Sequence, residues 1–324
     1  MSVQQVLPPQ ATVPTALLPV EPLHSRLLRV LLTLWRAMTV SRKVAIGSGI
    51  VGFFILVGLI GPLFLTTDPN TTSSLFLNPP SLAHPLGTTV VGQDIFHQML
   101  AGTRTSVFWG LATGLLVTIL SVVVGLVSGY FGGWVDDVLT LVTNVSLVLP
   151  SLPLAIVLAA YFPRGPLTIS LVIVFTNWAW QARVLRSQTL SMRSREFVTA
   201  ARSSGESAWR IIFFEIFPNE IGLVVAGFVS TTIYVVLTWA ALEFLNLGDG
   251  TIPSWGSILY WAQQAGALGG GLWWWFIPPG LCIATLGAGL SLINFGIDEI
   301  ADPRLRSTKP PKEKKASARE KAVA

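Results

Sequence analysis

The sequence predicts an all-α membrane protein with six transmembrane helices and both termini in the cytoplasm. Of its 324 residues, 52% are hydrophobic and only 11% are charged, a combination that soluble domains rarely show. Six apolar runs are each long enough to cross a bilayer, which takes roughly 20 residues per helix. All of the 21 Lys and Arg except Arg104 and Arg164 lie in the two tails or in and beside one loop. Cation-rich segments remain in the cytoplasm, so this distribution sets the orientation.

The chain divides into three regions. Residues 1–43 are expected to form a cytoplasmic tail, ending in an amphipathic helix on the membrane surface where cations alternate with leucines from Arg26 to Lys43. An extension of the first span would explain this pattern equally well. Residues 44–306 would form the transmembrane domain, and residues 307–324 a basic, disordered cytoplasmic tail. We place the spans near 44–65, 105–130, 138–161, 167–185, 221–245 and 272–296.

Small residues recur at helix-packing spacing within the predicted spans. Inside lipid there is no hydrophobic drive between helices, so small residues favour association by letting backbones approach closely. The general abundance of glycine in spans explains any single pair as well. The glycines concerned are Gly110 and Gly114, Gly125 and Gly129, and Gly287 and Gly289.

One stretch on the cation-rich side breaks the apolar pattern. Residues 196–218, EFVTAARSSGESAWRIIFFEIFP, hold a central glycine and a proline. Gly205 can adopt the positive φ that ends a helix. A second amphipathic helix is expected from Ser207 to Phe217, because Pro218 prevents a simple continuation. The stretch therefore predicts a short helix–turn–helix, which is the shape of a docking element.

This stretch resembles the cytoplasmic coupling loop of ABC importer permeases, where Glu-Ala-Ala, three residues, Gly and then Leu-Pro stand at fixed distances. An ordinary basic loop is the alternative. Three residues depart from the pattern: Thr199 replaces Glu, Glu215 an apolar residue and Phe217 Leu. The lost carboxylate puts in doubt an ion pair to the ATPase at Thr199. The resemblance implies coupling to an ATPase through Glu196, Thr199, Ala200, Ala201, Gly205, Phe217 and Pro218.

Four further segments resemble the C-type membrane subunits of dipeptide, oligopeptide and nickel importers, and they follow the family's order. Gln93 replaces a usual Arg in the first of them. The resemblance implies a type I ABC importer permease fold in a bacterial or archaeal plasma membrane. The segments are His84-Pro85-Leu86-Gly87-Thr88 with Gly92, Asp94, Gly102, Arg104 and Ser106; Gly129 to Asp136; Pro253 to Gly256; and Asp302 to Arg306.

Two residues near the outer end of the fifth span depart from the family in an informative way. The family commonly has a carboxylate there, four residues before a serine. Trp239 occupies the carboxylate position and Glu243 the serine position, on the same helix face one turn further outward. Carboxylates at a membrane edge are costly and therefore candidates for function. We take both residues as candidates for contact with substrate or a binding protein; the alternative is an interfacial Glu in water.

The sequence predicts no catalytic, cofactor-binding or metal site in this chain. Gly87 and Gly92 have the spacing of a phosphate-binding loop, but Gln93 and Asp94 follow where Lys and Ser or Thr are needed. The 3 His have no ligand spacing, and no Ser–His–acid arrangement is suggested. Nucleic-acid binding is not expected, because the cations lie beside spans. ATP and Mg are expected in partner ATPase subunits.

We therefore expect a permease subunit of an ATP-driven importer that forms half of a translocation pathway for di- and oligopeptides. The resemblance implies a heterodimer with a second permease, two cytoplasmic ATPases, an extracytoplasmic solute-binding protein and the surrounding bilayer. Nickel chelates or another small solute are the alternative cargo. A self-contained secondary transporter, which usually shows internal repeats or mid-membrane ionisable residues, and a membrane scaffold are the alternatives of another class.

Overall fold

The structure is a computed structural model that describes residues 42–65 and 67–301. The described residues form helices joined by irregular segments, with one isolated bridge between Thr88 and Asp94 and no β-strand among them. This agrees with the all-α prediction. The predicted amphipathic helix before Lys43, the Asp302 to Arg306 segment and the tail 307–324 lie outside the described residues.

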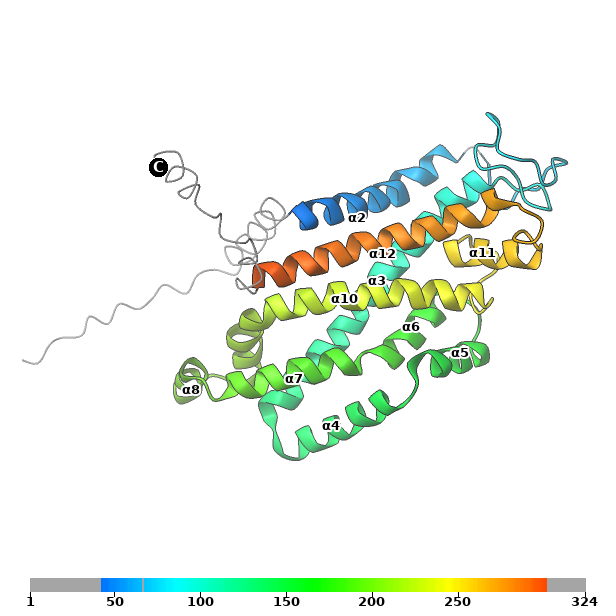
Figure 1. Cartoon of the computed structure of the whole chain (residues 1–324). Helices are drawn as coiled ribbons and strands as arrows, with labels where there is room; N and C mark the ends of the chain where they lie inside the picture. The colour runs from blue at the N-terminus through cyan, green and yellow to red at the C-terminus, as the bar shows by residue number, and fades with distance from the viewer. Residues whose placement is uncertain (1–41, 66, 302–324) are drawn as a thin grey trace, which may run out of the picture.

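The long helices lie side by side and pass between two ends of the molecule (Figure 1). Residues 67–94, α5 and α11 lie at one end, and α8 lies at the other with the first residues of α2 and the last of α12. We call these the loop end and the α8 end. The helices are α2 (Arg42–Ile60), α3 (Ile95–Phe131), α4 (Gly133–Val148), α5 (Ser151–Tyr161), α6 (Pro166–Asn177), α7 (Ala179–Arg193), α8 (Glu196–Ser203), α9 (Ala208–Arg210), α10 (Phe217–Phe244), α11 (Trp255–Gln264) and α12 (Trp273–Ala301), with a 3-10 turn η1 (Gly61–Phe64) and a π-helical segment η2 (Ile211–Ile216).

Four helical runs of the described residues are long and apolar enough to cross a membrane: Arg42–Phe64, Ile95–Phe131, Ala208–Phe244 and Trp273–Ile297. The predicted spans near 44–65, 105–130, 221–245 and 272–296 fall within these runs or overlap them closely. The second run begins ahead of its predicted span because Asp94 caps it, accepting hydrogen bonds from the backbone N–H groups of Phe96 and His97. The helix thus begins at a polar N-cap that lies before the apolar stretch from which the span was predicted.

The two remaining predicted spans are not straight helices. The span near 138–161 consists of α4 and α5, which meet at an angle of 91°. Leu149 precedes Pro150 and is extended, because a proline disfavours helical backbone in the residue before it. The span near 167–185 is divided between α6 and α7 at Trp178. Length and composition therefore give four straight spans, or five with the bent pair, in the described part of the chain, where we expected six.

α3 lies against α7 at the α8 end of the bundle, and two glycines bring the helices together. A Cβ added to Gly125 would lie 2.8 Å from the Ala182 carbonyl oxygen, and one added to Gly129 would lie 2.6 Å from the Thr189 Cβ. Such distances leave no room for a side chain. The Gly125 and Gly129 pair is thus used for close helix packing, as the spacing indicated.

α3 approaches α10 in the same way. A Cβ added to Gly110 would lie 2.8 Å from a Val236 methyl group, and one added to Gly114 would lie 2.5 Å from the Thr232 hydroxyl. The third predicted pair differs between its members. A Cβ on Gly289 would meet Ile50 of α2 at 2.8 Å, whereas one on Gly287 would meet nothing within 4 Å. The spacing therefore predicted close packing correctly except at Gly287.

The first residues of α2 lie beside the last residues of α12. Lys43 Nζ is 3.3 Å from Glu299 Oε2, and a Cβ on Gly296 would meet Val44. The two described chain ends therefore share one end of the bundle, which both termini on one side of a membrane would require. Which side that is stays a prediction from the charge distribution.

We expect the variant Gly125→Val to lose about 1–3 kcal/mol of stability, because its side chain would enter the α3–α7 contact. The matched control is Gly287→Val, where the added side chain meets open space. The apparent Tm of the purified protein in detergent would measure both. Equal Tm values for the two variants would contradict the role assigned to the α3–α7 contact.

Candidate functional site

The helix–turn–helix that we predicted as a docking element is present at the α8 end as α8, a turn and α9, and its docking role stays a prediction. α8 ends in a Schellman motif, in which the Glu206 N–H donates to the Ala201 carbonyl and the Gly205 N–H donates to the Arg202 carbonyl. Gly205 has φ +79°, which confirms the positive φ expected there. Ser207 then caps α9 by accepting from the Arg210 N–H. Local sequence therefore fixes this helix–turn–helix.

The second helix of the element does not end at Pro218, contrary to the prediction. The run continues from Ala208 to Phe244 through the π-helical segment η2. There the Phe217 N–H donates to the Ile212 carbonyl, one residue further back than in an α-helix. Pro218 then sits in the first turn of α10, where a missing N–H is tolerated. The second helix of the docking element and α10 are thus one helical run.

A small core attaches the docking element to the end of α3. The Val198, Ile211 and Ile212 side chains are buried against Leu126 and Tyr130. The element is therefore packed against the end of α3 through buried side chains.

Aromatic and charged contacts add to this packing. The Arg202 guanidinium lies 5.6 Å from the centre of the Tyr130 ring, a cation–π distance. Trp209 contacts Phe131 edge-on and stacks on Phe213. A salt bridge of 3.0 Å between Glu206 and Arg210 crosses the turn.

Of the seven residues predicted to couple to an ATPase, four are exposed on the surface and three are half-buried. Glu196, Thr199, Ala200 and Gly205 are exposed, so a partner can reach them. Ala201, Phe217 and Pro218 are half-buried. The exposed side also carries Phe197, whose exposure of 39% is high for so apolar a side chain. The element thus offers a surface of small, apolar and charged groups on a rigid base.

An ion pair beside the docking element was not predicted. Arg186 of α7 donates to Asp136 of α4 through two nitrogen atoms, Nε to Oδ1 at 2.5 Å and Nη2 to Oδ2 at 2.7 Å. The Ser128 hydroxyl of α3 and the Thr140 hydroxyl donate to the same carboxylate. This clamp joins α3, α4 and α7. The two charged residues are far apart in sequence, so no local pattern pairs them.

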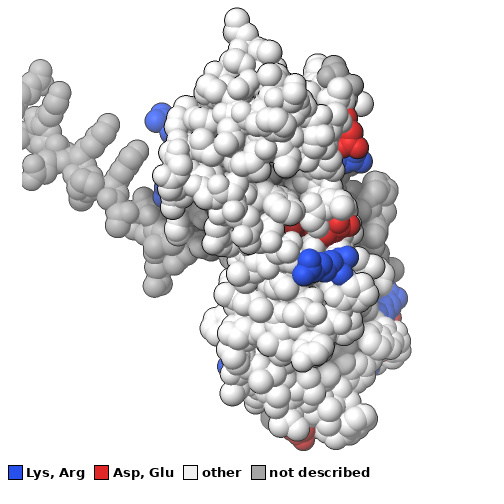
Figure 2. Space-filling model, turned by 90° about the vertical axis from the view of Figure 1, so that its right-hand side faces the viewer, with Lys and Arg blue, Asp and Glu red and all other residues white. Residues whose placement is uncertain are grey.

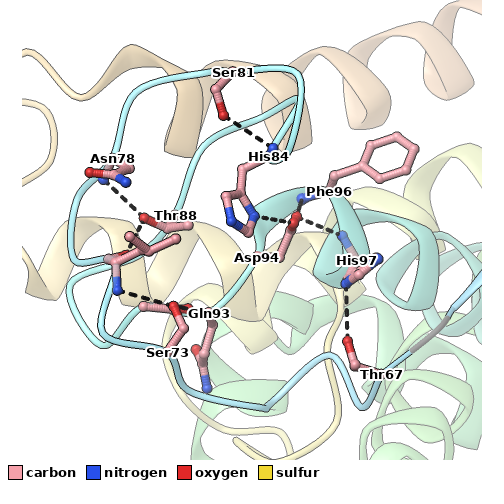
Figure 3. Close-up of polar contacts among 12 residues, drawn as sticks. Thr67, Ser73, Asn78, Ser81, His84, Thr88, Gln93, Asp94, Phe96 and His97 are labelled. Atoms are coloured by element: carbon pink, nitrogen blue, oxygen red, sulfur yellow. Dashed lines mark hydrogen bonds and ion pairs between the residues drawn. The ribbon is translucent and has the colours of Figure 1, made fainter.

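The loop end carries the segment from His84 to Asp94 that the sequence analysis singled out. One Asp94 carboxylate oxygen accepts from the Phe96 N–H at 2.7 Å, and the other lies 2.7 Å from His84 Nδ1 (Figure 3). The Thr88 hydroxyl donates to the Leu75 carbonyl at 2.6 Å. A Cβ on Gly92 would lie 2.1 Å from the Ser73 carbonyl oxygen. The segment is thus a structural clamp that folds residues 67–94 onto the start of α3.

Charged side chains are sparse on this end of the molecule, most of which is uncharged in Figure 2. A cavity of about 400 Å³ opens beside residues 67–94 and α11, and its polar lining includes Asn70, Gln93 and Gln98. The two ends of the bundle therefore differ in chemistry, with cations gathered around α8 and neutral polar groups at the loop end.

Glu243 and Trp239 are both buried, with exposures of 4% and 1%. Trp239 stacks on Trp109 with ring centres 5.9 Å apart. A Cβ on Gly248 would lie 2.4 Å from the Glu243 carboxyl carbon, and one on Gly256 would lie 2.5 Å from the Glu243 Cβ. The alternative of an interfacial Glu in water is wrong, because the side chain is buried, whereas contact with substrate or a binding protein stays a prediction. Neither side chain offers a polar group to a soluble partner here.

No group of three or more His, Cys, Asp or Glu side chains within residues 42–65 and 67–301 is placed to hold a metal ion. The absence of a bound cofactor stays a prediction from the sequence.

These features define a class of protein: a multi-pass helical membrane protein with a helix–turn–helix packed on the bundle at its cation-rich end. Residues 121–307 match the family model described as "Binding-protein-dependent transport system inner membrane component". The chain belongs to this family of ABC transporter permeases, as the resemblance of its motifs indicated.

Curated relatives support the assignment over most of the chain. The oligopeptide transport system permease protein OppC of Bacillus subtilis (strain 168) is 32% identical over 281 residues, which cover 85% of this chain and 91% of that protein. The dipeptide transport system permease protein DppC of Alkalihalophilus pseudofirmus is 30% identical, covering 81% and 86%. The glutathione transport system permease protein GsiD of Pectobacterium atrosepticum is 30% identical, covering 70% and 75%.

We expect Asp94→Ala to loosen residues 67–94 and to cost about 1 kcal/mol, because the variant loses the cap of α3 and the contact with His84. Asp94→Asn keeps the capping oxygen and is the matched control. Limited proteolysis of the folded protein would measure the cleavage rate within residues 67–94. Equal rates in both variants would contradict the role of Asp94 in holding this segment on α3.

Proposed function

We propose that this chain is a transmembrane subunit of an ATP-driven importer of di- or oligopeptides and forms half of the translocation pathway. The similar proteins are permeases of oligopeptide, dipeptide and glutathione transport systems, and all of these cargoes contain peptide bonds. These names favour peptides over the nickel chelates that the motifs left open. By this proposal the subunit works in a bacterial or archaeal plasma membrane, with the α8 end in the cytoplasm.

The observation that carries the coupling proposal is the rigid seat of the docking element. A displacement of α8 would reach α3 through the buried Val198 and Ile211 side chains. It would reach α10 through the continuous helical run from Ala208. A partner that moves this element would therefore move bundle helices rather than a loose loop.

The partners follow from this role. Two cytoplasmic ATPases that hold ATP and Mg would push on the docking elements of this chain and of a second, homologous permease in a heterodimer. A solute-binding protein would deliver cargo at the loop end. Closure of the ATPases would switch the bundle between inward and outward access, the general logic of alternating access. Hydrolysis would belong to the partners.

We expect Gly205→Val to uncouple ATP hydrolysis from peptide uptake in the reconstituted complex. Gly205 has φ +79° and nothing within 4 Å of an added Cβ, so the substitution acts on backbone conformation alone. A β-branched residue resists this conformation, at a cost of about 1–2 kcal/mol or more. Gly205→Asn is the matched control, because Asn tolerates a left-handed backbone.

The measurements are peptide uptake into proteoliposomes and ATPase activity stimulated by the binding protein. The proposal requires Gly205→Asn to stay coupled and Gly205→Val to lose uptake while the complex still assembles. Wild-type uptake in the valine variant would refute the docking role.

The alternative functions, a secondary transporter and a scaffold, differ from an importer subunit in the partners that the chain would need for activity. A secondary transporter would carry solute without ATPases, and a scaffold would purify with another stable partner. Co-purification of two ATPases and a second permease, with uptake that depends on ATP, is the expected result.

A further inference from the structure

A polar cavity of about 350 Å³ lies where the two interrupted spans meet α10. Its wall includes residues on both sides of the α4–α5 bend, such as Leu149 and Ser151, and on both sides of the α6–α7 break, such as Asn177 and Gln181. Tyr234, in the second half of α10, also lines it. Membrane transporters commonly bind solutes at interrupted helices near the midplane, because non-helical backbone is tolerated where it lines a cavity.

Most of the exposed lining is apolar, but eight of the twelve lining residues have hydroxyl or amide side chains and none carries a charge. Polar groups within an apolar span are costly unless they find partners, so their concentration at one place calls for an explanation. The polar lining residues are Ser146, Ser151, Thr176, Asn177, Gln181, Ser230, Thr231 and Tyr234.

Some of these groups pair across helices and hold the cavity together. The Ser151 and Tyr234 hydroxyls are 3.0 Å apart, which joins α5 to α10. The Thr231 hydroxyl donates to Gln181 Oε1 at 3.1 Å, which joins α10 to α7. Gln181 Nε2 is buried without a hydrogen-bond partner among the described residues. This nitrogen lies against Gly227 of α10, where an added Cβ would lie 2.4 Å from it, so the free groups of the wall are the hydroxyls and Asn177.

We propose that this cavity binds the backbone peptide groups of the cargo as it crosses the membrane, with neutral side chains as donors and acceptors. A peptide group has one N–H donor and one C=O acceptor, and hydroxyl and amide side chains can pair with both. A wall without fixed charge treats acidic, neutral and basic peptides alike. The volume is at the lower end of the range for small-molecule sites, which suits a short section of extended chain. This inference rests on the proposed peptide-import function.

The first test adds a negative charge to the wall. Asn177→Asp should slow uptake of an acidic tripeptide relative to a basic one by about tenfold, the size expected for like charges a few Å apart in a partly hydrated site. The control Asn219→Asp makes the same change at an exposed residue in the first turn of α10. The probes are Ala-Glu-Ala, Ala-Ala-Ala and Ala-Lys-Ala in proteoliposomes with one binding protein, whose own preference cancels in the ratio to wild type.

The second test adds the charge after folding and so does not depend on the stability of Asn177→Asp. In a Cys282→Ser background, which removes the 1 Cys of the chain, Ser230→Cys is treated with an anionic thiol reagent. The control is Phe175→Cys, on α6 beside the cavity residue Thr176 but not in the wall. We expect Ser230→Cys to be labelled in the assembled complex and to gain the same discrimination against the acidic peptide.

The outcomes separate this inference from the proposed function. If the wild-type complex takes up none of the three peptides, the proposed function fails. If wild type takes them up but the acidic-to-basic uptake ratio of Asn177→Asp equals that of Asn219→Asp, the cavity does not contact the cargo. Failure of the reagent to label Ser230→Cys in the assembled complex would overturn the inference independently.

Discussion

The close approach of α7 and α10 to α3 is the constraint on which the rest of the structure depends. In lipid, apolar side chains gain nothing by leaving hydrocarbon, so helices associate through backbone approach and a few hydrogen bonds. α3 provides both. Its glycines let α10 and α7 come near, and the Ser121 hydroxyl lies 2.7 Å from the Trp178 carbonyl at the α6–α7 break. The Thr113 and Ser170 hydroxyls, 2.8 Å apart, add a second link to α6. α3 therefore also stabilises the break.

The docking element uses the same support. Its core residues pack on the last turns of α3, close to the Asp136–Arg186 clamp that joins α3, α4 and α7. Gly129 lies between these two features, against α7. The end of the bundle that would receive a push is thus tied together by apolar packing, an ion pair and a glycine contact. Three different kinds of interaction would have to fail before the element could move alone.

The sequence predicted best what local chemistry decides. The positive φ of Gly205 and the helix–turn–helix around it follow from a few neighbouring residues, and the glycine spacing follows from helix geometry. The bend at Pro150 had a local signal too, because a residue before proline avoids helical backbone; a long apolar run concealed it. The effect of Pro218 was predicted wrongly because a π-helical segment, which residue propensities do not predict, precedes it. Pro218 then lies in the first turn of α10, where a missing N–H is tolerated.

Tertiary partners decided the remaining differences. Glu243 is buried because Gly248 and Gly256 leave room for its side chain, and α11 brings Gly256 back to α10. Asp136 meets Arg186 only once α4 and α7 lie together. The polar cavity likewise gathers residues from five helices, each of which alone resembles an ordinary serine, threonine or amide in a span.

α7 relates the cavity to the docking element. Its first residues, including Gln181, form part of the cavity wall, and its last residue, Arg193, leads almost directly into α8. α10 repeats this arrangement, since η2 begins at the docking element and Ser230 and Tyr234 lie in the wall. Two walls of one cavity thus belong to helices that continue into the element an ATPase would move. Because the breaks at Leu149 and Trp178 interrupt the helices that line the cavity, such a displacement would change the shape of the cavity. A neutral wall suits this motion, since hydroxyl and amide pairs can exchange with water or peptide groups at small cost, whereas a buried ion pair would have to be broken in each cycle.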